Sequence, residues 1–228
     1  MKTKLSTIKL LAPKRILIVD DHPMTRQGVS QLLSREPDLA VCGEVENAQQ
    51  AMVAVQSLKP DLVLTDITMP GKSGLEFLKD MQTLHAGVPV MVLSMHDETI
   101  YAERALRAGA RGYLMKSESG DRLLEAVRQV LRGEVYVSKH ISVSLLNVLT
   151  GNHSPVHDAI LSALTQREFE VFQLIGQGLT TREIGRRIFI SGKTVETHRI
   201  HIRDKLKLKT GPALTAFAVR WAAANQLI

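Results

Sequence analysis

Short apolar runs alternate with helical patterns through the first part of the chain. Five such runs lie at residues 15–20, 39–42, 61–66, 89–94 and 112–116. Most are continuously apolar rather than alternating, which is typical of strands that are covered on both faces. Between them, apolar residues recur at three- and four-residue spacing, as in Val29, Leu32 and Leu33. This alternation predicts an α/β fold with a doubly wound, five-stranded parallel sheet.

The last part of the chain has regularly spaced helix starts instead. Residues 165–168 and 180–183 both match the capping box, in which a hydroxyl and a carboxylate satisfy free backbone donors. Ser191 can cap a third helix, and Pro212 suits the first turn of a fourth. We therefore predict a small all-α domain. The expected boundaries are a first domain at 14–133, a linker with one helix at 134–158, and the helical domain at 159–228.

Charge is unevenly distributed between these two domains. Residues 160–228 carry 11 of the 29 Lys and Arg residues but 5 of the 23 Asp and Glu residues, a net charge of +6. Residues 1–159 therefore carry 18 of each sign and are neutral overall. A basic domain joined to a neutral one favours an anionic partner, with double-stranded DNA as the first candidate.

The sequence lacks the features of membrane proteins and of secreted proteins. No apolar run is long enough to span a bilayer, and Lys2, Lys4 and Lys9 interrupt the apolar residues of the N-terminus. The single cysteine, Cys42, cannot form an internal disulfide and fits a reducing compartment. We expect a cytoplasmic protein without a membrane partner. The sequence predicts no function for the basic segment 1–13.

Polar side chains follow four of the predicted strands at the point where each strand ends. They are Asp20, Asp21, Asp66, Ser94 and Lys116. Ligands of open parallel sheets bind at this edge, so we expect these side chains to lie together. Carboxylates that converge there repel one another, and a bound Mg²⁺ would remove the conflict.

Position then suggests a role for each group. Asp66 follows the central run and is the candidate nucleophile, which would form an aspartyl phosphate. Asp20 and Asp21 would hold Mg²⁺ with Asp66 and the backbone carbonyl of Thr68. Lys116 would neutralise phosphoryl oxygens.

Two further residues need weighing. Ser94 would hydrogen-bond a phosphoryl oxygen and could reposition the loop after its strand. His22 follows the acidic pair, and we expect it to border the first helix rather than to bind metal. Any one strand end can be polar merely because it meets solvent, but suitable groups at all four ends favour a site.

The third helix of the basic domain, at 191–207, has two distinct faces. Val195, His198, Ile202 and Leu206 should pack on the domain core. On the other face Ile200 could meet a thymine methyl in the major groove, although a single exposed hydrophobic residue is common. The spacing to the preceding helix fits a helix-turn-helix. The residues expected to contact DNA are Arg182, Lys193, Thr194, Thr197, Ile200, His201 and Arg203.

Four motifs of the first domain resemble the receiver domain of two-component response regulators. They are residues 16–22, residues 62–70 with Gly74, residues 92–94 and residues 112–116. The resemblance implies a flavodoxin-like fold, Mg²⁺, and transfer of a phosphoryl group from a sensor histidine kinase to Asp66. It also places Tyr113 as the aromatic switch residue, whose side chain turns inward when Ser94 moves.

The last domain is similar to the LuxR-type helix-turn-helix, through residues 164–168, 178–184, 190–198 and 202–206. Together the two resemblances identify the chain as a NarL/FixJ-family response regulator, a DNA-binding transcription regulator and not an enzyme. Two positions depart from the family pattern. Gly185 stands where alanine is usual, and Glu196 replaces a position that is often basic. Gly185 is expected to cost the helix about 1 kcal/mol.

Phosphorylation is expected to favour a homodimer and to free the recognition helix from the receiver. The stripe of Leu214, Phe217, Ala218 and Trp221 could pair with its twin on DNA or pack on its own domain. RNA polymerase is a further candidate partner. Two other functions remain open, a Mg²⁺-dependent phosphotransfer enzyme and a regulator that works without phosphate.

Overall fold

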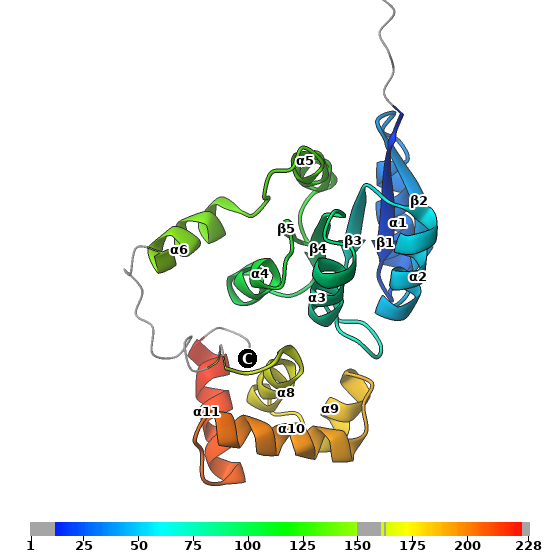
Figure 1. Cartoon of the computed structure of the whole chain (residues 1–228). Helices are drawn as coiled ribbons and strands as arrows, with labels where there is room; N and C mark the ends of the chain where they lie inside the picture. The colour runs from blue at the N-terminus through cyan, green and yellow to red at the C-terminus, as the bar shows by residue number, and fades with distance from the viewer. Residues whose placement is uncertain (1–11, 150–160, 162, 225–228) are drawn as a thin grey trace, which may run out of the picture.

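Five strands form one parallel sheet in the order β2-β1-β3-β4-β5 in the computed structural model of the chain (Figure 1). The strands are β1 (Lys14–Val19), β2 (Leu39–Val45), β3 (Leu62–Thr65), β4 (Val90–Ser94) and β5 (Gly112–Met115). The structure describes residues 12–149, 161 and 163–224. This strand order is that of flavodoxin-like folds, so the prediction of a doubly wound sheet is confirmed.

Helices cover both faces of the sheet. Helices α1 (Pro23–Leu33) and α5 (Gly120–Leu131) pack on one face, and α2 (Ala48–Leu58), α3 (Gly74–Leu84) and α4 (Glu98–Arg107) pack on the other. Side chains of β1 alternate between the faces, with Ile16 and Ile18 toward α1 and α5, and Leu17 and Val19 toward the other three helices. Both faces are buried, which is why the strands are continuously apolar.

The chain after α5 returns along β5, at the edge of the sheet. Tyr136 forms a parallel bridge with Gly112, and the amide of Tyr113 donates to the carbonyl of Tyr136 at 2.9 Å. This pairing covers an edge that would otherwise expose backbone donors and acceptors. The expected linker helix is α6 (Lys139–Leu149). Residues 150–158 of the predicted linker and most of the basic N-terminal segment lie outside the described residues.

Four helices form the described part of the C-terminal domain, as the sequence predicts. They are α8 (Gln166–Gly176), α9 (Thr181–Arg187), α10 (Gly192–Lys205) and α11 (Gly211–Ala224). Thr165 and Thr180 both form complete capping boxes, and Ser191 accepts a hydrogen bond from the amide of Thr194 at the start of α10. Such caps satisfy amides that the first turn leaves free, which explains why these helices begin where they do.

The stripe on α11 packs on its own domain. Leu214, Ala218 and Trp221 are buried, and Trp221 lies against the ring of Phe169 on α8. The stripe could pair with its twin on DNA or pack on its own domain, and packing within the domain accounts for Trp221, its largest residue. Among the described residues, no helix has both the length and the apolar character needed to cross a membrane.

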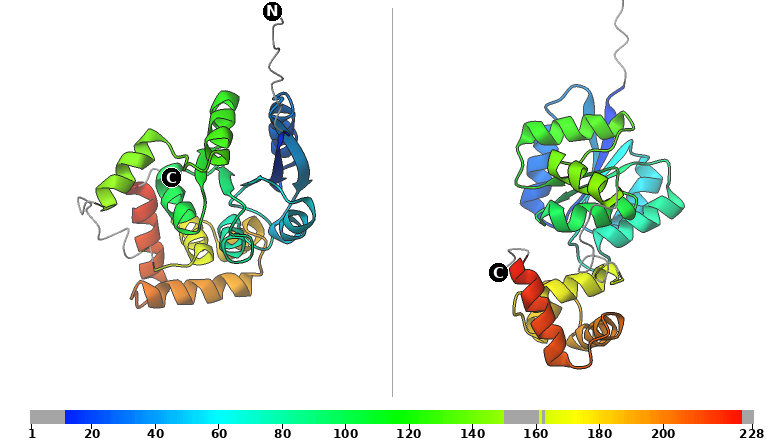
Figure 2. Two further views of the ribbon diagram at one scale, coloured as in Figure 1. Left: turned by 45° about the horizontal axis from the view of Figure 1, so that its top comes forward. Right: turned by 90° about the vertical axis from the view of Figure 1, so that its left-hand side faces the viewer.

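The C-terminal domain lies beyond the edge of the sheet at which the strands end (Figures 1 and 2). The two domains meet where α4 contacts α8. The hydroxyl of Tyr101 on α4 donates to Oε1 of Gln173 on α8. Arg104, one turn later on α4, lies with its guanidinium 3.7 Å from the ring centroid of Phe169.

Candidate functional site

Asp20, Asp66 and Lys116 lie together at the edge of the sheet where the strands end. Each directly follows its strand, β1, β3 or β5, and the two carboxylates are neighbours because β1 pairs with β3. The ammonium of Lys116 lies 2.6 Å from Oδ2 of Asp20 and 2.7 Å from Oδ2 of Asp66. Burial opposes the charge on Lys116, but Asp66 and Asp20 outweigh it and raise the pKa of this lysine. Lys116 is therefore held charged between two buried carboxylates.

Asp21 completes an acidic cluster that could hold a metal ion. One ligand atom each of Asp20, Asp21, His22 and Asp66 lies within 4.8 Å of the others. Oδ1 of Asp21 is buried and accepts no hydrogen bond from any described residue, although Nδ1 of His22 is 2.9 Å away. Burial raises the pKa of Asp21, and the charges of Asp66 and Asp20 add to this effect. A hard divalent cation such as Mg²⁺ would satisfy that oxygen and relieve the repulsion, so the donor set fits.

His22 lies at the edge of this cluster. It occupies the N-cap position of α1, as expected, but its side chain makes no capping hydrogen bond. Its Nδ1 instead lies beside Asp20 at 3.2 Å and beside Asp21. The imidazole is thus close enough to the carboxylates to count among the candidate ligands, a possibility that the sequence interpretation set aside.

The loop after Asp66 is shaped by a close backbone approach. The amide of Ile67 donates to Oδ1 of Asp66 at 2.6 Å, which leaves Oδ2 toward Lys116. A Cβ atom at Gly74 would lie 1.9 Å from the carbonyl oxygen of Asp66, so only glycine fits there. Thr68 is on this loop, and a hydrogen bond of 2.6 Å joins its Oγ1 to Nε2 of His96. Its carbonyl remains a predicted metal ligand.

Ser94 and Tyr113 are both buried beside the loop that follows β4. The amide of His96 donates to Oγ of Ser94 at 3.2 Å, and the hydroxyl of Tyr113 donates to the carbonyl of His96 at 2.8 Å. Tyr113 is 1% exposed, so its ring already points inward in this structure. Burial raises the pKa of the Tyr113 phenol far above its usual value.

Sequence reasoning missed His96, which touches three of the predicted site residues. Burial lowers the pKa of its imidazole, and the charge of Asp66 partly offsets this effect. A lone histidine two residues after a strand carries no motif, so a single sequence offers no signal for it.

The face of α10 expected to meet DNA is open to solvent. Lys193, Thr194, Thr197, Ile200 and His201 are exposed, whereas Arg203 is half-buried. The opposite face packs on the domain through Val195, Ile202 and Leu206, with His198 half-buried beside them. The predicted division of this helix into two faces therefore holds.

The structure gives a local reason for both departures from the family pattern. A Cβ atom at Gly185 would lie 2.7 Å from the carbonyl oxygen of Ile190, so the turn between α9 and α10 approaches this helix too closely for alanine. The carboxylate of Glu196 accepts a hydrogen bond of 2.6 Å from the hydroxyl of Thr181 on α9.

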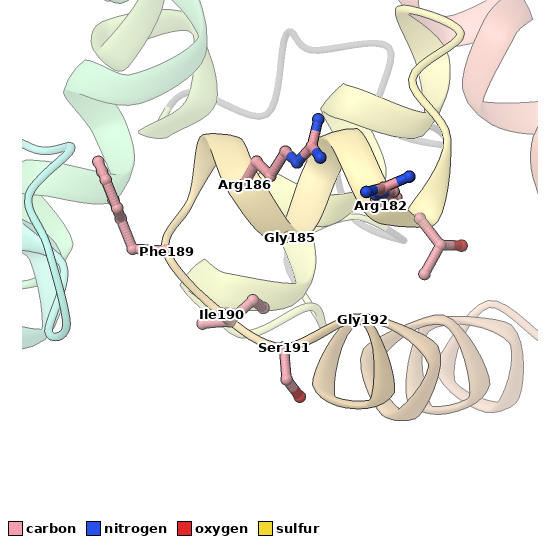
Figure 3. Close-up of a pocket in the computed structure, with 8 residues that line it drawn as sticks. Arg182, Gly185, Arg186, Phe189, Ile190, Ser191 and Gly192 are labelled. Carbon is pink, nitrogen blue, oxygen red and sulfur yellow. The ribbon is translucent and has the colours of Figure 1, made fainter.

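An open hollow of about 590 Å³ lies beside α9, this turn and the first residue of α10 (Figure 3). It is lined by Thr181, Arg182, Gly185, Arg186, Phe189, Ile190, Ser191 and Gly192. Arg182, which we expect to contact DNA, is thus on the same surface as the start of α10.

One expectation needs correction. We expected phosphorylation to free the recognition helix from the receiver, but Lys193, Thr197 and Ile200 on its outer face are already exposed. The receiver holds the C-terminal domain through α8 and the segment before it instead. The guanidinium of Arg104 donates to the carbonyl of Leu161 at 2.6 Å and to that of Leu164 at 3.4 Å. Domain contact therefore restrains where the C-terminal domain sits, and does not cover these side chains.

Comparison with known proteins gives matches along most of the chain. Residues 16–128 match the family described as response regulator receiver domain, and residues 162–218 match bacterial regulatory proteins, luxR family. The nitrate/nitrite response regulator protein NarL of Escherichia coli (strain K12) is 40% identical over 200 residues, which cover 87% of this chain and 91% of NarL. The oxygen regulatory protein NreC of Staphylococcus haemolyticus is 35% identical over 211 residues, which cover 90% and 97% of the two chains.

A solved structure has the same fold along both domains. It is RcsB from Salmonella enterica serovar Typhimurium bound to promoter rprA in the presence of phosphomimetic BeF3-. The TM-score is 0.61 at 22% sequence identity, and the match covers 91% of this chain and 98% of RcsB. At that identity the likeness speaks for the fold alone.

Proposed function

Because this chain belongs to the NarL/FixJ family of response regulators, which are transcription regulators with a receiver domain and a LuxR-type DNA-binding domain, we propose that phosphorylation of Asp66 controls its binding to DNA. A sensor histidine kinase supplies the phosphoryl group, in the cytoplasm. The receiver spans residues 14–133, the linker 134–158 and the DNA-binding domain 159–228. RNA polymerase is the further partner through which transcription changes.

The meeting of Asp20, Asp21, Asp66 and Lys116 at one edge of the sheet carries this proposal. An oxygen of Asp66 attacks the phosphorus of a phosphohistidine, and the new O–P bond forms as the P–N bond breaks and the imidazole leaves with the electron pair. Asp20, Asp21 and Asp66, with the carbonyl of Thr68, would hold Mg²⁺, which would supply positive charge beside the phosphoryl oxygens.

Lys116 and Ser94 then hold the transferred group. Lys116 is already 2.7 Å from Asp66, so its ammonium can follow the negative charge from the carboxylate to the phosphoryl oxygens. The hydroxyl of Ser94 donates to another of these oxygens. That contact draws Ser94 toward Asp66 and changes the position of the segment 94–96 relative to Tyr113.

DNA binding is assigned to α10 and the start of α9. Thr197, Ile200 and His201 are placed to contact base edges in the major groove. Arg182, Lys193, Thr194 and Arg203 are placed to contact the backbone, where basic side chains set affinity and its dependence on salt. RcsB is bound to a promoter in its solved structure. In another solved structure, two RcsB dimers are bound to two parallel DNAs. We propose that this chain also binds DNA as a homodimer, on two half-sites.

Measuring DNA affinity with and without a phosphoryl analogue tests this function. The probe is a duplex selected from random sequence by the full-length protein. Beryllofluoride with Mg²⁺ should tighten binding to that duplex, because the analogue occupies the site at Asp66. Equal affinity in both conditions would favour a regulator that works without phosphate. The selected duplex would also show the half-site sequence and spacing.

A further inference from the structure

His96 connects three segments of the proposed phosphorylation site. Its ring bonds to the hydroxyl of Thr68, two residues after Asp66, at 2.6 Å. Its amide donates to the hydroxyl of Ser94, and its carbonyl accepts from the hydroxyl of Tyr113. Side chain and backbone of one residue are therefore attached to the loop after Asp66, to the end of β4 and to β5.

The same imidazole also packs against the domain interface. Its ring centroid lies 4.5 Å from that of Tyr101 on α4, with an angle of 30° between the ring planes. Tyr101 in turn reaches the DNA-binding domain twice, because its hydroxyl donates to Gln173 and its ring lies 5.8 Å from that of Phe169. A single side chain, that of Tyr101, thus connects His96 to α8.

We propose that His96 is a positioning residue that transmits the phosphorylation state of Asp66 to the DNA-binding domain, through Thr68 on one side and Tyr101 on the other. This inference rests on the proposed function and adds the route by which the two domains are coupled. It accounts for control of DNA binding in a chain whose outer face of α10 is already exposed, because what changes is the contact between α4 and α8.

Packing explains how a small displacement could travel this way. Tyr101 is 1% exposed and Tyr113 is 1% exposed, so neither ring can move without its neighbours. Phosphoryl contacts to Ser94 and metal contacts near Thr68 act on the two segments to which His96 is bonded. Movement of either segment therefore shifts the imidazole against Tyr101, and Tyr101 carries the shift to Gln173 and Phe169.

The variant His96→Phe separates the two halves of this route. A phenyl ring keeps the stacking on Tyr101 but cannot bond to Thr68. The measured quantity is the ratio of DNA affinities with and without beryllofluoride and Mg²⁺, with the selected duplex as the probe. We expect a ratio of about 5 to 150 for the wild type and one within about twofold of 1 for His96→Phe. Tyr101→Phe, which loses the bond to Gln173, should lower the ratio as well.

Two further measurements keep a structural role distinct from a coupling role. Labelling of each variant by acetyl phosphate should stay at the wild-type level. Fluorescence of Trp221, which lies 5.5 Å from Phe169, should respond to beryllofluoride in the wild type and not in His96→Phe. The matched control is His140→Phe on α6, because His140 is exposed and should leave the ratio unchanged.

The outcomes are separable. A wild-type ratio that His96→Phe and Tyr101→Phe both retain would overturn the inference and leave the proposed function intact. Loss of labelling in His96→Phe would also overturn it, since His96 would then belong to the phosphorylation site itself. A ratio of 1 in the wild type would overturn the proposed function together with the inference.

Discussion

Nζ of Lys116 lies 2.7 Å from Oδ2 of Asp66, the oxygen that does not accept the amide of Ile67. Both side chains are at most 5% exposed, and the same ammonium lies 2.6 Å from Asp20. Buried carboxylates that lose their partner are strongly destabilised, because little water replaces it. Lys116 therefore stabilises the fold in addition to its proposed role with phosphate.

Replacing Lys116 with glutamine should separate these contributions. We expect the unphosphorylated protein to lose about 3–5 kcal/mol of unfolding free energy in metal-free buffer, because two buried carboxylates lose their counter-charge. Mg²⁺ should restore part of that loss. Urea unfolding with and without Mg²⁺ measures it, and a variant as stable as the wild type without metal would contradict the assignment.

Asp21 should control affinity for the metal. Replacing it with asparagine removes a carboxylate whose pKa is raised by burial and whose Oδ1 accepts no hydrogen bond within the described part of the chain. We expect Mg²⁺ to raise the melting temperature of the wild type, as a ligand of the native state does, and to have a much smaller effect on Asp21→Asn. Asp121→Asn, an exposed position on α5, is the control and should respond like the wild type. Chelation with EDTA should stop labelling by acetyl phosphate.

Arg104 should hold the two domains together. Arg104→Ala removes a contact with the ring of Phe169 and hydrogen bonds to two backbone carbonyls. We expect the free energy of the contact between the domains to fall by roughly 2–4 kcal/mol. This figure is the sum of a lost cation–π contact and lost hydrogen bonds from a charged group. Small-angle scattering should then show a larger radius of gyration. Arg107→Ala, on the same helix but 69% exposed and paired with Glu103, should not change it.

Glu168 should make the stability of the C-terminal domain depend on pH. Burial raises the pKa of Glu168, but the ammonium of Lys205 and the Thr165 cap outweigh it and lower the pKa below 4.5. A carboxyl with a depressed pKa in the folded state stabilises the fold above its unfolded pKa. That contribution is lost as the pH falls from 4.5 through the folded value.

Glu168→Gln should therefore be less stable at neutral pH, by about 1.5–3 kcal/mol for the charged hydrogen bond. The stability of this variant should also depend less on pH below 4.5, the pKa of the glutamate in the unfolded chain. Unfolding followed by the fluorescence of Trp221 measures both. An identical pH dependence in the two proteins would show that Glu168 is not the responsible group.

The candidate phosphorylation site could be predicted from the sequence because parallel strands bring their ends to one edge. Asp20, Asp66 and Lys116 each follow an apolar run, so their meeting depends on topology alone. The helix starts at Thr165 and Thr180 can also be predicted from the sequence, since a capping box involves residues only three apart. The contacts of His96 depend on how the loops after β3 and β4 pack within the receiver, and the contact of Tyr101 with Gln173 depends on how the two domains pack. No local sequence pattern encodes either. The sequence predicts that Gly185 destabilises its helix, because the close approach of Ile190 to this position cannot be inferred from the sequence.

Locating the phosphoryl group tests the central claim most directly. The full-length protein is incubated with acetyl phosphate and Mg²⁺, and mass spectrometry of its peptides locates the label. We predict labelling at Asp66 in the wild type and in Asp121→Asn, and none in Asp66→Asn, which should remain folded. Asp66→Asn labelled to the same extent as the wild type, or a label found on another residue, would contradict the account.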